Sequence, residues 1–115
     1  MKLVVILLLV AVALVLARRL LGGARVSQSV VLEKIKAGAK VVDVRSPGEF
    51  QGGAYPGAVN IPVQELEGRL GELPKDRPIV VYGASGARSA AAERMLRARG
   101  YGDVVNGGGL FQMPR

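Results

Sequence analysis

The segment best suited to chemistry is the run at positions 83–89, which reads Gly-Ala-Ser-Gly-Ala-Arg-Ser. Its two glycines allow backbone conformations that turn several N–H groups toward one point. The apolar residues before it predict a strand, and the residues after it predict a helix whose N-terminal end carries partial positive charge. Such a loop is suited to bind an anion or to stabilise an anionic nucleophile at its first position, although a plain strand-to-helix connection remains the alternative. The candidate site residues are Gly83, Ala84, Ser85, Gly86, Ala87, Arg88 and Ser89.

The composition excludes much of the usual catalytic chemistry. The 115 residues include no cysteine and no histidine. This removes disulfides, thiol nucleophiles, imidazole bases and the common zinc and iron–sulfur ligand sets. No Walker-type phosphate loop is present, and Gly107-Gly108-Gly109 lacks the spacing of a dinucleotide-binding motif. We therefore expect no metal and no cofactor.

The positive charge is concentrated at the N-terminus. The net charge is +7, but residues 26–115 hold 12 basic and 9 acidic residues, which leaves +3. This part has no basic run with interleaved aromatic residues, which is the pattern of a nucleic-acid surface. We expect no nucleic-acid partner.

The first 21 residues differ from the rest of the chain. Leu3 to Ala17 is an uninterrupted apolar run of 15 residues, and Arg18 and Arg19 follow it. A helix of that length covers about 22 Å, against about 30 Å for the hydrocarbon core of a bilayer. We interpret residues 1–21 as a membrane anchor, with a signal peptide cleaved near Ala17 as the alternative and a buried core helix as a third. The arginines after the run favour a domain on the cytoplasmic side, whereas cleavage would export it to the periplasm.

After a linker at 22–26, residues 27–115 predict one domain in which helices and strands alternate. The apolar runs are short and rich in β-branched residues, as in buried parallel strands. Gly107-Gly108-Gly109 predicts a flexible or tightly turning segment. The fold class is therefore α/β, a small mainly parallel sheet flanked by helices. The expected elements are a helix from Ser27 or Ser29 to Gly38, strands at 41–44, 58–61, 79–82 and 104–105, a short helix from Ser46, and helices at 63–73 and 89–99.

A set of motifs in residues 27–115 resembles the rhodanese, or sulfurtransferase, homology domain, in particular small single-domain bacterial rhodaneses that carry an N-terminal export or membrane segment. The motifs stand in the order expected for that family. They are Val41-Val42-Asp43-Val44-Arg45, Pro47-x-Glu49-Phe50, Pro56-Gly57-Ala58-Val59-Asn60-Ile61-Pro62, Pro78-Ile79-Val80-Val81-Tyr82, Ser85-Gly86-x-Arg88-Ser89 and Asn106-Gly107-Gly108-Gly109-Leu110.

The resemblance implies a loop built around a cysteine that takes sulfane sulfur from a donor such as thiosulfate and passes it to an acceptor. The position of that cysteine is Gly83 in this chain. The chain also has Ala84 where a basic or polar residue is common, and Ala54 where the family often has histidine. No catalytic residue is therefore assigned.

Other family positions support the loop. The resemblance carries Asp43 and Arg45 over as a pair at a strand end, and such pairs are more often structural than catalytic. Arg88 could contact an anion or hold the shape of the loop. We expect Glu49 to be structural and Tyr82 to pack in the core.

Three functions remain open from the sequence. The first is a membrane-anchored, catalytically inactive module that binds a small oxyanion, such as sulfate or thiosulfate, or an unidentified protein partner. The second is a sulfurtransferase whose cysteine was replaced artificially or in this copy only. The third is a purely structural interaction domain. Glycine has no side chain for persulfide chemistry, which favours the first over the second.

Overall fold

The computed structural model describes residues 1–21 and 26–115. It begins with helix α1 (Lys2–Leu21), whose leucine and valine side chains are exposed from Leu3 to Leu16. Positions 22–25 of the predicted linker lie outside the described residues.

The predicted membrane anchor is wrong. In the described part of the chain, no helix is both long enough and apolar enough to cross a membrane. The physical reason is that the apolar run of α1 stops after 15 residues, at Arg18 and Arg19, short of the roughly 20 apolar residues that a span needs. The predicted localisation, a membrane-anchored domain facing the cytoplasm, is corrected by this finding.

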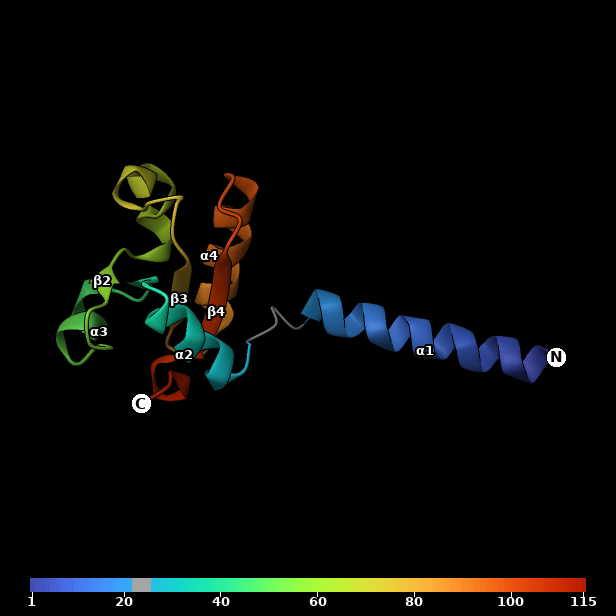
Figure 1. The fold of residues 1–115 in the computed structure, drawn as a ribbon. Helices are drawn as coiled ribbons and strands as arrows, with labels where there is room; N and C mark the ends of the chain where they lie inside the picture. Colours follow the sequence, from blue (N-terminus) through green and yellow to red (C-terminus); the bar gives the residue numbers. More distant parts are fainter. Residues whose placement is uncertain (22–25) are drawn as a thin grey trace.

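A parallel sheet of four strands, in the order β2-β1-β3-β4, forms the centre of the domain (Figure 1). Val41 of β1 pairs with Val80 of β3, and Val80 pairs with Val105 of β4. The predicted α/β class is confirmed. The strands are β1 (Lys40–Asp43), β2 (Val59–Asn60), β3 (Ile79–Gly83) and β4 (Val104–Gly109).

Both faces of the sheet are buried, because alternate valines of each strand point to opposite sides. On one face, Val41, Val80 and Val105 pack with Val31 of helix α2 (Gln28–Lys36). On the other face, the remaining strand valines pack with Leu96 of helix α4 (Ala87–Ala98). The two helices therefore cover opposite faces of the sheet.

The short helix α3 (Pro47–Gln51) forms as the sequence predicts. The Ser46 hydroxyl accepts a hydrogen bond from the Glu49 N–H, and the Glu49 carboxylate accepts one from the Ser46 N–H. This reciprocal capping box provides acceptors for two backbone N–H groups at the start of the helix.

Two predicted elements differ from the structure. The helix expected at 63–73 is instead two 3-10 segments, η1 (Val63–Glu65) and η2 (Glu67–Glu72), with non-helical backbone angles at Arg69. Gly68 and Gly71 lower the helix propensity of this stretch, although the apolar spacing still buries Leu66 and Leu73.

The glycine run 107–109, expected to be flexible or to turn, belongs instead to strand β4 and is buried. A last 3-10 segment, η3 (Leu110–Gln112), follows it directly.

Candidate functional site

The predicted loop connects β3 to α4 at the edge of the sheet where the parallel strands end. Gly83 is the last residue of β3, and Gly86 caps α4 in a left-handed conformation with φ 89°. The Ala90 N–H bonds back to the Gly86 carbonyl at 2.9 Å. The N–H groups of residues 87–89 precede this bond and have no partner within the helix, which is the arrangement that favours a negative charge.

Gly83 is buried, and its backbone can carry a side chain. Its φ does not lie in the left-handed region that favours glycine. A Cβ atom placed on it would lie 3.5 Å from the Ser89 nitrogen and 3.5 Å from the Arg88 Cβ, which are ordinary van der Waals distances. A side chain at position 83 would therefore start next to the N-terminus of α4.

Ser89 braces the loop through its side chain. Its hydroxyl is buried, donates to Asn106 Oδ1 at 2.7 Å and lies 3.0 Å from the Gly86 carbonyl oxygen. Asn106 Oδ1 also accepts from the Gly108 N–H at 2.8 Å. Only the backbone N–H of Ser89, and not its hydroxyl, remains to face an anion.

Arg88 forms a bidentate ion pair with Glu49, with Nη1–Oε1 and Nη2–Oε2 distances of 2.8 and 3.2 Å. The pair ties the loop to α3, since Glu49 also takes part in the capping box with Ser46. The hydrogen bonds from Arg88 and then those from Ser46 lower the pKa of Glu49 to about 2. Of the two roles considered for Arg88, this geometry supports holding the shape of the loop.

Asp43 and Arg45 form a buried ion pair with an Oδ2–Nη2 distance of 2.7 Å. Tyr82, fully buried beside them, donates its hydroxyl hydrogen to Asp43 Oδ2 at 2.7 Å and accepts from the Tyr55 N–H at 2.9 Å. Burial, as the main cause, raises the pKa of Tyr82 to about 12. Arg45 also donates to the Gly53 carbonyl at 2.7 Å, so the pair fixes the neighbouring segment.

Two supporting contacts were not predicted from the sequence. Glu49 and Arg88 are 39 residues apart, and nothing in the local pattern of either indicates the other. The second contact is the hydrogen bond between Ser89 and Asn106. The sequence did indicate that Asn106 has a polar partner, because a lone amide in a strand of buried valines needs one. In the described ranges 1–21 and 26–115, no three acidic side chains gather closely enough to hold a metal ion.

Comparison with known proteins identifies the family. The family model described as Rhodanese-like domain matches residues 27–111. This chain belongs to that family. A sulfurtransferase of Allochromatium vinosum is 42% identical over 76 residues, which cover 65% of this chain and 71% of the relative. The thiosulfate sulfurtransferase PspE of Escherichia coli is 37% identical over 78 residues, covering 64% and 75%.

Solved structures have the same fold. A rhodanese from E. coli, solved with anions, is 35% identical and covers 66% of this chain and 94% of that one, with a TM-score of 0.62. The Bacillus anthracis protein CoADR-RHD is 36% identical with a TM-score of 0.68, over 76% of this chain. The matched part of the present chain covers only 16% of the longer Bacillus anthracis chain.

Proposed function

We propose that this rhodanese-family chain does not transfer sulfur itself and that loop 83–89 binds a small oxyanion, such as sulfate or thiosulfate, or a partner protein. The observation that carries the proposal is glycine at position 83, in a sequence without any cysteine. A persulfide forms on the sulfur of a cysteine thiol, and the chain has no cysteine.

The backbone of the loop supports anion binding. The N–H groups of residues 87–89 precede the first hydrogen bond of α4, and Asp43 and Arg45 hold the adjoining strand end. The related E. coli rhodanese was solved with anions. An exposed helix terminus contributes about 0.3–1 kcal/mol, so we expect a dissociation constant in the millimolar range.

The test is a titration of the ¹⁵N-labelled full chain with sulfate and with thiosulfate, followed by amide chemical shifts. Saturable shifts should concentrate at residues 84–89. Sodium chloride at matched ionic strength is the control for screening. No saturable shift in the loop, or the same shifts with chloride, would contradict oxyanion binding.

A second candidate function is a thiosulfate sulfurtransferase whose cysteine was replaced in this copy. The observation that favours it is the room at Gly83, where a Cβ would make only ordinary contacts. The wild-type chain should form no thiocyanate from thiosulfate and cyanide above background. Thiocyanate formation that depends on intact protein would refute the proposed inactivity. Thiocyanate formation by the Gly83→Cys variant would show that the loop can still support sulfur transfer, and its absence would show that the loop has lost this ability.

A further inference from the structure

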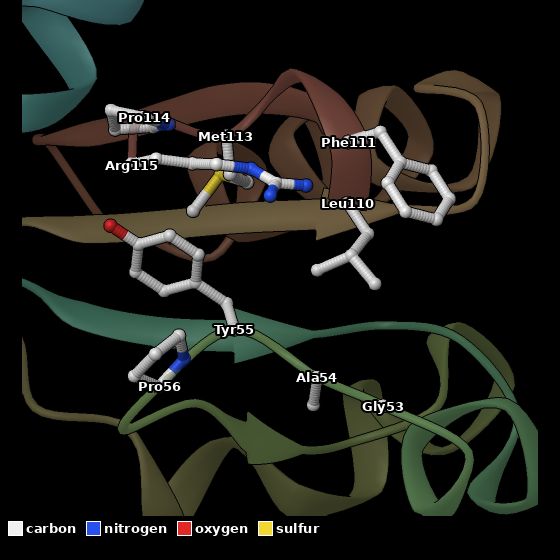
Figure 2. Close-up of a pocket in the computed structure, with 9 residues that line it drawn as sticks. All are labelled: Gly53, Ala54, Tyr55, Pro56, Leu110, Phe111, Met113, Pro114 and Arg115. Atoms are coloured by element: carbon white, nitrogen blue, oxygen red, sulfur yellow. The ribbon is translucent and has the colours of Figure 1, made fainter.

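A pocket of about 410 Å³ lies outside loop 83–89, between the segment at 53–56 and the C-terminal segment at 110–115. Figure 2 shows the Tyr55 ring and Pro56 on one side and Leu110, Phe111 and Met113 on the other. A volume of this size is at the lower end of the range for small-molecule sites. The pocket therefore suits a ligand of about one ring with a short substituent.

Both walls of the pocket are fixed by contacts to the core. The Tyr55 N–H donates to the buried Tyr82 hydroxyl, and the Gly53 carbonyl accepts from Arg45. On the opposite wall, Met113 is 1% exposed and packs in the core. These contacts hold the backbone at Tyr55 and the Met113 side chain in place, so binding would not need to order these parts of the walls.

The lining combines apolar surface with one positively charged side chain. Arg115 is the one charged side chain among the nine lining residues, and none of them is acidic. In Figure 2 its side chain extends past Met113 toward Leu110. Phe111 is 81% exposed, so its ring offers apolar surface that the folded domain leaves uncovered.

We propose that this pocket binds a small organic monoanion with an apolar body, in the class of aromatic carboxylates. The ring would lie against Tyr55, Leu110 and Phe111, and the carboxylate would accept hydrogen bonds from the Arg115 guanidinium, which matches a carboxylate in geometry and charge. None of the residues that line the pocket belongs to loop 83–89, and neither proposal depends on the other.

The experiment titrates the ¹⁵N-labelled full chain with phenylacetate, and in parallel with neutral phenylacetamide and cationic phenethylamine. Phenylacetate should bind with a dissociation constant of about a millimolar, shifting amides at 53–56 and 110–115. The amide should bind about threefold more weakly, and the amine more weakly still.

Substitutions at two exposed residues test which side chains bind the ligand, and they leave the core undisturbed. Arg115→Gln should remove the preference for phenylacetate over phenylacetamide, whereas Phe111→Ala should weaken both ligands. Arg94→Gln, at an exposed arginine on α4, is the matched control and should change neither. Shifts confined to residues 84–89, equal binding of the three compounds, or a preference that survives Arg115→Gln would overturn the proposal.

Discussion

Gly83 lies beside the groups that would stabilise a thiolate, although it has no side chain of its own. The Ser89 nitrogen is 3.5 Å from the place of a Cβ at this position, and the helix that begins there has its positive end toward it. In the rhodanese family, the loop performs this stabilisation for cysteine. The stabilising groups in this chain belong to the backbone, so they do not depend on which residue occupies position 83.

We therefore expect Gly83→Cys to carry a thiol whose pKa lies below the ordinary value of about 8.5. The measurement is the rate of alkylation by iodoacetamide as a function of pH. Gly68→Cys is the matched control, because a Cβ there meets no atom within 4 Å. Equal thiol pKa values in the two variants would mean that the loop does not stabilise an anion.

The contacts of Glu49 should depend on pH. Its pKa falls from 4.5 to about 2 in the folded chain. A carboxyl group whose pKa is lower in the folded state stabilises the fold above its unfolded pKa, and this contribution is lost as the pH falls. The contacts of Glu49 with Arg88 and Ser46 should therefore weaken between about pH 4.5 and pH 2.

The check is an NMR titration of the Glu49 side-chain carboxyl carbon. Arg88→Gln should raise the pKa of Glu49 toward 4.5 but not fully to it, since the Ser46 hydrogen bonds remain. Glu93→Gln, at a half-buried residue of α4 whose ion pair is with Arg97, should leave the titration of Glu49 unchanged. An unchanged Glu49 titration in Arg88→Gln would show that the ion pair does not form in solution.

At the scale of elements, strand β4 and the loop fit together because glycines allow close approach. A Cβ on Gly109 would lie 2.5 Å from the Ala84 carbonyl oxygen, and backbone cannot rotate away as a side chain can. One on Gly107 would strike the Met113 sulfur, which belongs to a flexible side chain. Gly109 is therefore the position at which the strand limits the shape of the loop.

Gly109→Ala should lower the free energy of unfolding by about 1–3 kcal/mol, because the methyl group forces the loop or the strand to move. Urea denaturation measures this loss, and amide shifts at residues 84–86 report the displacement. Gly102→Ala is the control, since a Cβ there is in open space. A stability loss no larger than that of the control would contradict the close packing of β4 on the loop.

Much of this element order could be predicted from the sequence, since β-branched runs and capping residues are local signals. The strand at 79–82 and the capping box of Ser46 and Glu49 are examples. The helix expected at 63–73 was wrong because apolar periodicity reports which side chains are buried and not how tightly the backbone winds. The structure of the glycine run at 107–109 was predicted wrongly. Residues without a side chain are needed there because Met113 and Ala84 lie so close, and these two residues approach the run only in the folded chain.

At the scale of the whole molecule, the family motifs in residues 27–115 predicted the sheet, and the family match over 27–111 agrees. The N-terminal segment was less well predicted. Its apolar composition suggested a membrane anchor, but length and not composition alone decides whether a helix spans a bilayer.

The Asp43, Arg45 and Tyr82 network joins parts of the molecule that are distant in sequence. It links the end of β1 to β3 and to the segment at 53–55, through buried and partly buried hydrogen bonds of 2.7–2.9 Å. Replacing one member removes a hydrogen-bond partner from the buried groups that remain, and the loss of a buried charge's counterion costs more than a lost neutral hydrogen bond. The loss in the free energy of unfolding should therefore be larger when the group left behind is charged than when it is neutral.

We expect Asp43→Ala, which removes the carboxylate partner of the buried Arg45 guanidinium, to lower the free energy of unfolding by about 3–5 kcal/mol. Tyr82→Phe, which leaves the Tyr55 N–H without its acceptor, should cost about 1–3 kcal/mol. Urea denaturation of the full chain measures both, with exposed Asp76→Ala as the control for removing a carboxylate. If Asp43→Ala cost no more than Asp76→Ala, the buried pair would not hold the strand ends together, and the support assigned to Asp43 and Arg45 would have to come from backbone packing.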